Sequence, residues 1–199
     1  MNGFEKRAAL IKEKIMKTTL EMLNTWEPKR MRIADIAKTA GVSQVTIYNY
    51  FGSKEALLKE TFKDYIQRSI REFEEYISEK RSLKEIIEYT LIKEKESYSA
   101  IPPAIVKELM IDDPEMFRYI QEHYESQVIP LIARMVEDGR KRGEISEKVS
   151  VSAVLMLMRM YVQSSGEMLE AARNQDNPDA FLEEIVHLFF YGLCGREQE

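Results

Sequence analysis

Five neighbouring side chains in the first quarter of this sequence are suited to contacting nucleic acid. They occupy residues 44–49 and are Gln44, Val45, Thr46, Tyr48 and Asn49. A side-chain amide such as that of Gln44 can donate and accept hydrogen bonds at the edge of adenine, and methyl groups can contact the thymine methyl. Tyr and Asn side chains commonly hydrogen-bond to phosphates. The spacing therefore favours a surface that reads duplex DNA, provided that these residues share one exposed face.

The flanking residues predict how this face is held. Ile36 and Ala37 lie on one face of a short helix over residues 33–40, which must stop at Gly41 because glycine takes the left-handed cap conformation without steric cost. Ser43 is suited to N-cap a second short helix over residues 44–50, on which Ile47 points back at the first. Two short helices joined by a glycine turn indicate a helix-turn-helix. A helical hairpin without a nucleic-acid role is the alternative, but it leaves the polar outer face unexplained.

The run over residues 42–57, VSQVTIYNYFGSKEAL, resembles the N-terminal signature of TetR-type transcriptional regulators. The resemblance is dense over residues 33–58, where an aromatic pair is followed by a Ser-Lys-Glu start to the next helix, and looser over the rest of the chain. It implies a DNA-binding head, an effector pocket under the fourth helix, and a dimer interface formed by the last two helices of each subunit.

The charge of the chain is unevenly distributed. Residues 1–54 hold ten Lys and Arg against five acidic residues, a net charge of +5; since the whole chain carries −5, residues 55–199 carry −10. A basic head on an acidic body directs the head toward phosphate. The expected DNA-binding residues are Arg32, Ser43, Gln44, Val45, Thr46, Tyr48, Asn49, Tyr50 and Lys54. Of these, Gln44 is the expected base reader, and Lys54 is expected on phosphate together with Tyr48, Asn49 and Tyr50.

Apolar residues recur at helical spacing throughout, and no segment alternates with period two, so the predicted fold class is all-α. We expect about nine helices: a three-helix helix-turn-helix head in residues 1–54, and a ligand-binding and dimerisation body in residues 55–199. One long helix is expected from Pro114 to Gly143, with Pro130 kinking or dividing it.

The last two predicted helices are apolar around more of their circumference than a surface helix requires, which favours packing against a second copy. The expected dimer residues are Val154, Met158, Val162, Ser165, Leu169, Phe181, Ile185, Leu188, Phe189 and Gly192. A monomer with a thick core is the alternative.

Met-rich and aromatic side chains from several helices are candidates for a small-molecule cavity, because methionine forms adaptable apolar walls. The residues expected there are Tyr65, Phe73, Tyr89, Thr90, Met110, Phe117, Ile120, His123, Tyr124, Met156 and Met160. Plain core packing is the alternative for each of them.

Other functions lack support in the residues. The two histidines, His123 and His187, are far apart, no spacing indicates a metal site, and no glycine-rich loop indicates a phosphate-bound cofactor, so we expect no enzyme, no metal and no cofactor. No secretory signal or membrane span is expected, and the single cysteine, Cys194, suits a reducing cytoplasm.

These observations predict a cytoplasmic, ligand-responsive transcriptional regulator whose partners are double-stranded DNA, a second copy of the chain and a small-molecule effector. The expected mechanism is that of a repressor on a palindromic operator, released by a small lipophilic effector. The alternative is a constitutive or architectural DNA-binding protein whose body only dimerises.

Overall fold

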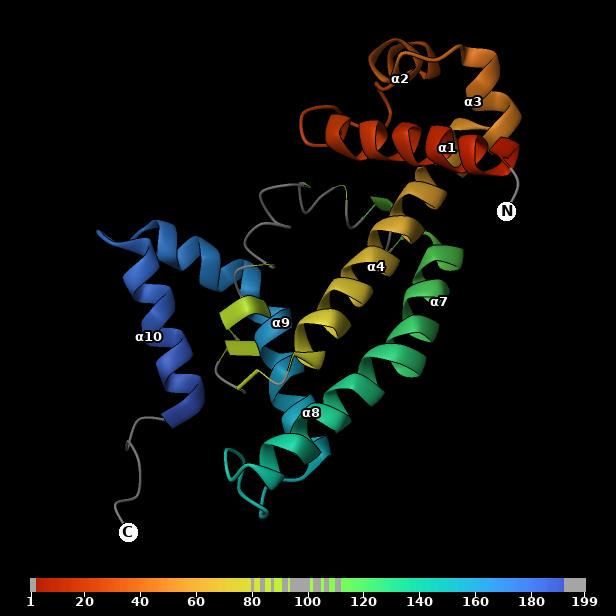
Figure 1. Ribbon diagram of the computed structural model, residues 1–199. Coiled ribbons are helices and arrows are strands. Elements are labelled where there is room, and N and C mark those ends of the chain that lie inside the picture. The colour runs from red at the N-terminus through yellow and green to blue at the C-terminus, as the bar shows by residue number, and fades with distance from the viewer. Residues whose placement is uncertain are drawn as a thin grey trace. The chain divides into compact units, whose positions relative to one another are not determined.

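The structure is a computed structural model that describes residues 3–79, 81–82, 85–86, 88–90, 93, 101, 105, 108–109 and 112–191. Every regular element in these residues is helical, which confirms the predicted all-α fold (Figure 1). The elements are α1 (Gly3–Met22), α2 (Ile33–Ala40), α3 (Gln44–Phe51), α4 (Lys54–Ser78), α7 (Pro114–His123), the π-helical turn η2 (Tyr124–Val128), α8 (Ile129–Lys141), α9 (Val151–Arg173) and α10 (Pro178–Tyr191).

The contacts of the backbone group the chain into two compact units. The first comprises Met1–Phe73 and Glu96–Ser126, and the second comprises Glu74–Lys95 and Gln127–Glu199. The division at residues 54 and 55 expected from the sequence is a division by function, and it stays a prediction.

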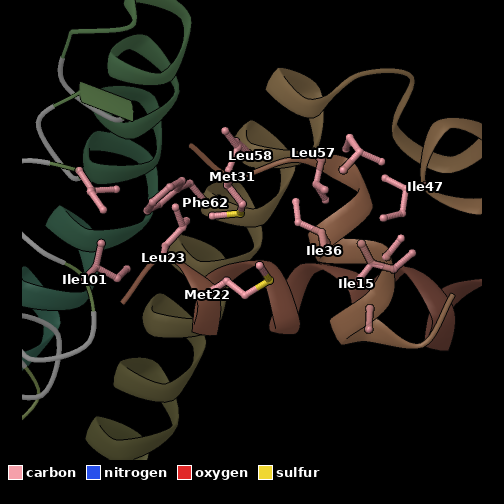
Figure 2. Close-up of a cluster of buried hydrophobic side chains, with 14 of the residues drawn as sticks. Ile15, Met22, Leu23, Met31, Ile36, Ile47, Leu57, Leu58, Phe62 and Ile101 are labelled. Atoms are coloured by element: carbon pink, nitrogen blue, oxygen red, sulfur yellow. The ribbon is translucent and has the colours of Figure 1, made fainter. Parts of the chain in front are cut away.

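The core of the first unit joins α1, α2 and α3 to the first turns of α4. Ile15 of α1, Ile36 of α2, Ile47 of α3 and Phe62 of α4 are all fully buried in one hydrophobic cluster (Figure 2). Fully burying a side chain of this kind stabilises the fold by about 1.5–3 kcal/mol. The helix-turn-helix is therefore held from behind by two other helices.

The first helix is shorter than its apolar spacing predicts. That spacing continues to Trp26, but α1 ends at Met22, and the backbone N–H groups of Thr25 and Trp26 both bond to the Met22 carbonyl. Pro28 disfavours helical backbone at the residue before it, so the chain turns here. The Trp26 side chain is 42% exposed and contributes little to the core.

The long helix expected from Pro114 to Gly143 is divided, as Pro130 predicts. Asp113 caps α7, accepting bonds from the N–H groups of Glu115 and Met116 at 3.0 Å. The π-helical turn η2 follows, and Pro130, which has no N–H to donate, stands in the first turn of α8 directly after it.

In the second unit, α9 packs against both α8 and α10. The buried face of α8 carries Leu131, Ile132, Met135 and Val136. Ser150 caps α9 by accepting a bond from the Ala153 N–H at 3.1 Å. Among the helices that the structure describes, none is long and apolar enough to cross a bilayer.

Candidate nucleic-acid interface

The turn between α2 and α3 is set by one glycine. Gly41 has φ +63°, the left-handed conformation that ends a helix. The Val42 N–H bonds back to the Ala37 carbonyl at 3.0 Å, and the Gly41 N–H bonds to the Lys38 carbonyl at 3.2 Å. These bonds fix the direction in which α3 leaves the turn.

Ser43 starts α3 in the predicted manner. Its Oγ accepts a bond from the Thr46 N–H at 3.0 Å and lies 2.8 Å from the Thr46 Oγ1. The Thr46 hydroxyl is thus in contact with Ser43, and Thr46 also carries a methyl group. That methyl suits the thymine contact expected from the sequence.

One face of α3 is exposed and the opposite face is anchored. Gln44 and Asn49 are exposed, and the side chains of Val45 and Tyr48 are 66% and 50% exposed. Ile47 is completely buried in the head. A buried β-branched side chain fixes the rotation of the helix, so the polar face keeps a defined orientation toward solvent.

Tyr50 lies differently from its neighbours on α3. Its side chain is half-buried, packs against the core cluster and meets the Phe51 ring edge-on at 6.5 Å between centroids. The ammonium of Lys12 lies 5.8 Å from the centroids of both rings. Packing at the end of α3 is therefore one role of Tyr50, in addition to the phosphate contact predicted for it.

Lys54, the first residue of α4, has intramolecular partners. Its ammonium donates to the backbone carbonyls of Pro28 and Met31, at 3.1 and 3.2 Å, in the connection between α1 and α2. The neighbouring Ser53 caps α4 by accepting a bond from the Ala56 N–H at 3.0 Å. The sequence predicts a phosphate contact for Lys54, and the structure gives its charged group a different set of acceptors.

The basic residues before α2 are exposed. Arg32 precedes the helix in extended conformation, and its backbone N–H bonds to the Asp35 carboxylate at 3.3 Å. Lys29 and Arg30 form surface ion pairs with Glu108 and Glu27. Such exposed pairs contribute little free energy, so they leave the basic side chains available to an anionic partner.

Sequence reasoning did not single out two lysines of α1, one of which lies at the end of α3 and the other at the turn between α2 and α3. Lys12 lies at the end of α3, over Tyr50 and Phe51, and the Lys14 ammonium lies 3.6 Å from where a Cβ on Gly41 would be. The signal was the run of basic residues on α1, but their spacing alone did not indicate which of them reach the turn.

A polar seam ties α4 to α7, which run alongside one another (Figure 1). The Lys59 ammonium lies 3.0 Å from Oδ2 of Asp113 and 2.7 Å from Oε2 of Glu115. The Lys63 ammonium lies 3.2 Å from Oε1 of Glu115. Lys59 and Lys63 hold the pKa of Glu115 below its usual value. The Met116 backbone N–H and the Lys59 ammonium do the same for the pKa of Asp113.

The pocket residues predicted in the first unit differ in exposure. Tyr65, Phe73 and Ile120 are half-buried. Phe117 and Tyr124 are 44% and 41% exposed.

The two polar pocket candidates bond within their own helical segments. In the first unit, Nδ1 of His123 lies 2.8 Å from the carbonyl oxygen of Tyr119. In the second, the Thr90 hydroxyl donates to the Ile86 carbonyl at 2.8 Å. Tyr89 stacks on Tyr76 with ring centroids 3.9 Å apart. Met110 lies outside the described residues.

Two methionines predicted for the pocket lie on an exposed face of α9. Met156 and Met160 are 60% and 54% exposed, and Leu157 beside them is 40% exposed. By contrast Val154 and Met158, which the sequence assigned to the dimer interface, are half-buried. In the single chain, the outer face of α9 is thus the one that carries Met156 and Met160.

The other predicted dimer residues lie on α9, on α10 or beyond them. Phe181 and Ile185 are half-buried, and Leu188 is 43% exposed. Four of the predicted dimer residues on these helices have side chains that the structure does not describe, namely Val162, Ser165, Leu169 and Phe189. Gly192 lies outside the described residues.

Comparison with known proteins finds similarity to bacterial regulatory proteins. Residues 15–61 match the family model of bacterial regulatory proteins, tetR family. The chain is similar to the fatty acid metabolism regulator protein of Bacillus subtilis (strain 168), with 31% identity over 126 residues. That alignment covers 60% of this chain and 63% of the relative, less than two thirds of the relative's length.

Solved structures share the fold over nearly the whole chain. The transcriptional regulator FadR from Bacillus subtilis, in complex with stearoyl-CoA, has a TM-score of 0.67 and 23% identity, covering 91% of this chain and 98% of that one. FadR from Bacillus halodurans has a TM-score of 0.67 and 18% identity, covering 93% and 97%. A transcriptional regulator from Saccharomonospora viridis, in complex with choline, has a TM-score of 0.69 and 16% identity, covering 91% and 96%. At these identities the likeness shows the fold alone.

Proposed function

This chain belongs to the TetR family of bacterial regulatory proteins, and on that premise we propose that it is a DNA-binding transcriptional repressor controlled by a small lipophilic effector. The observation that carries the proposal is the exposed face of α3. Gln44, Val45, Tyr48 and Asn49 are exposed there, while Ile47 is buried behind them. A short helix with this division fits the DNA major groove.

Roles within the face follow from side-chain chemistry. Gln44 stands in the first turn of α3, where recognition helices contact base edges, and its amide can pair bidentately with adenine. Val45 and the methyl group of Thr46 contact thymine methyls. Tyr48, Asn49, Ser43 and Arg32 hold phosphates at the rim.

We propose that the protein acts as a homodimer. The exposed apolar side chains of α9, with Leu188 of α10, form the surface that we assign to the second copy. This assignment moves Met156 and Met160 from the predicted pocket to the predicted interface, because both are more than half exposed. A two-fold dimer presents two copies of α3 to half-sites about one helical turn apart, and the operator is therefore palindromic.

We assign the effector to the class of long-chain acyl thioesters. The support is the 31% identity to a regulator of fatty acid metabolism and the stearoyl-CoA bound by a regulator of the same fold. Of the predicted pocket residues, the half-buried Tyr65, Phe73 and Ile120 are the ones that we retain as apolar wall. Effector binding favours a state with weaker DNA affinity.

Selection of bound sites from random duplex DNA tests DNA recognition and symmetry together. We expect a palindrome whose half-sites lie about one helical turn apart. Recovery of no preferred sequence would contradict the proposal. The Gln44→Ala variant, selected in parallel, should give the same palindrome with relaxed choice at one base pair in each half.

Titration of the selected duplex with stearoyl-CoA tests the effector class. We expect DNA affinity to fall by about 5–150-fold, the range of ordinary allosteric coupling. Free coenzyme A and a non-ionic detergent are the matched controls, and neither should have this effect. Unchanged affinity with every acyl thioester, despite specific DNA binding, would favour the constitutive alternative.

A further inference from the structure

The turn between α8 and α9 is seated on a glycine in the last turn of α8 (Figure 1). Gly139 is buried, and the Ile145 side chain, which is 8% exposed, packs directly on it. A Cβ on Gly139 would lie 2.9 Å from Cδ1 and 3.1 Å from Cγ1 of Ile145. Carbon atoms in contact prefer a separation of about 3.5–4.0 Å. Ile145 therefore occupies the space that a side chain on residue 139 would need.

Backbone hydrogen bonds fasten the same turn to α8. The N–H groups of Glu144 and Ile145 both bond to the Gly139 carbonyl, at 2.9 and 3.3 Å, and the Gly143 N–H bonds to the Arg140 carbonyl at 2.9 Å. Gly143 has φ +74°, so the turn is a Schellman motif with its glycine in the left-handed conformation. A glycine inside a helix costs stability relative to alanine, and at position 139 the packing of Ile145 supplies the reason for it.

The far end of the connection is also tied to α8. The Arg140 guanidinium donates to the Val149 carbonyl, just before the first residue of the α9 cap. That residue, Ser150, caps α9 by accepting a bond from the Ala153 N–H at 3.1 Å. Because both ends of the connection are held to the last turn of α8, that turn sets the direction in which α9 leaves.

The same turn contacts the segment that follows α4. The Arg142 guanidinium donates to the Arg81 carbonyl at 3.2 Å and to the Glu144 carboxylate at 2.9 Å. The Arg81 guanidinium in turn lies 5.0 Å from the centroid of the Tyr76 ring, in the last turn of α4. The end of α4 and the start of α9 therefore meet at the turn that is seated on Gly139.

We propose that Gly139 is a positioning residue: by leaving room for Ile145, it sets the direction of α9 relative to the end of α4. The inference rests on the proposed function, because α9 carries the surface assigned to the second copy and α4 begins in the core of the head. The turn joins these two helices, so Gly139 determines the half-site spacing that the dimer accepts.

The first test needs no DNA. In an ordinary helical site, Gly→Ala stabilises a protein. At Gly139 the new methyl group must displace Ile145, so the variant should unfold at a lower urea concentration, and hydrogen exchange at the Glu144 and Ile145 amides should become at least about tenfold faster. Gly3→Ala is the matched control, since Gly3 is a helical glycine with open space around it. Unchanged exchange at both amides in Gly139→Ala would overturn the proposal.

A second substitution tests whether the clash with Ile145 is the cause. Ile145→Ala removes both of the atoms that a Cβ on Gly139 would approach most closely. In that background Gly139→Ala should no longer destabilise the protein, because contacting residues have non-additive effects. Ile145→Val removes only the nearer atom and should give partial relief, which keeps the test available if the alanine background folds poorly. Additive effects in both backgrounds would contradict the proposal.

Binding to operators of altered spacing separates positioning from stability. The duplex selected by the wild type is compared with duplexes that have one base pair inserted or deleted at the centre. A loss of stability alone would weaken binding to all three duplexes by the same factor. We expect Gly139→Ala to change the ratio of their affinities at least about tenfold, because the two recognition helices are spaced differently. An unchanged ratio in a folded, DNA-binding dimer would overturn the proposal.

Failure of the proposed function gives a different result. A wild-type protein that selected no duplex would overturn the proposed function and leave no half-site spacing for Gly139 to determine. The exchange and double-variant measurements on the free protein would still decide whether Gly139 seats the turn between α8 and α9.

Discussion

The exposed faces of α3 and α9 are built from opposite kinds of side chain. On α3 the amides of Gln44 and Asn49 point to solvent, whereas on α9 the exposed side chains include Met156, Leu157 and Met160. Solvated amides cost nothing to leave exposed and can later bond to fixed groups on a ligand. Neighbouring exposed apolar side chains are stabilised when another apolar surface covers them.

Exposure alone does not identify the partner of a surface, because the partner depends on which kind of side chain is exposed. A polar face held rigid by a buried anchor suits a partner with directional hydrogen-bonding groups, such as base edges. An apolar face suits a partner that excludes water, such as the same face of a second copy. Substitutions that change one face while leaving the other intact can therefore separate the two partners.

The largest effect is expected from a charge on the apolar face. Met160→Asp would bury an unpaired carboxylate in the proposed dimer interface, twice by symmetry, and should weaken dimerisation at least about 100-fold. Sedimentation velocity over a range of protein concentrations measures the change. Met160→Leu keeps an apolar side chain and should dimerise normally; an unaltered dimer in the Asp variant would remove α9 from the interface.

The next largest effect is expected from truncating Ile47, the buried side chain behind the polar face of α3. Ile47→Ala removes a fully buried side chain and should lower the free energy of unfolding by about 2–4 kcal/mol. On the same helix, Val45→Ala alters a side chain that is 66% exposed and should change it by no more than about 0.5 kcal/mol. Urea denaturation of both variants measures the difference. Equal losses would mean that α3 is not anchored through Ile47.

A smaller effect is expected from the reading residue itself. Gln44→Ala should cost about 1–3 kcal/mol of discrimination at a single base pair and leave the unfolding free energy unchanged. Binding to operators that carry each base at that position measures the cost. Uniform weakening on every operator would assign Gln44 to the phosphates instead.

The smallest effect is expected from the polar seam between α4 and α7. The folded-state pKa values of Asp113 and Glu115 lie below their ordinary values of 3.8 and 4.5. Groups with a depressed pKa stabilise the fold above the ordinary pKa, and this stabilisation is lost as pH falls through the folded value. The melting temperature should therefore fall as pH decreases from about 5 to about 2.

The matched variant for this pH dependence is Lys59→Met, which removes the cation shared by Asp113 and Glu115. Its melting temperature should fall less steeply over the same pH range. Identical profiles would show that the seam contributes nothing to the acid sensitivity of the protein.

Much of the head could be predicted from sequence because its signals are local. Gly41 ends α2 in the left-handed conformation and Ser43 caps α3, as their residue types predict, since each depends on neighbours within five positions. Pro130 marks the division of a long helix for the same reason. A cap or a break is decided by backbone geometry that the residue itself imposes.

The predictions that depend on distant partners stay predictions. Lys54 matched the expected motif, but its ammonium bonds to carbonyls more than twenty residues away. On α9 the sequence showed apolar residues on several sides of the helix and assigned Met156 and Met160 to a pocket, whereas the structure exposes both. Periodicity indicates that a helix has two apolar sides, but it does not indicate which neighbouring helix covers each side.

Sequence alone is enough to predict where α2 ends and α3 begins, which side chains of α3 face outward, and the net charge of the head. These follow from capping, helical periodicity and composition, which act over one or two turns. Tertiary packing sets the acceptors of the Lys54 ammonium, the pairing of Lys59 and Lys63 with α7, and the exposed side of α9. Those depend on how separate helices pack, because a side chain's partner is fixed by the surface that packing brings to it.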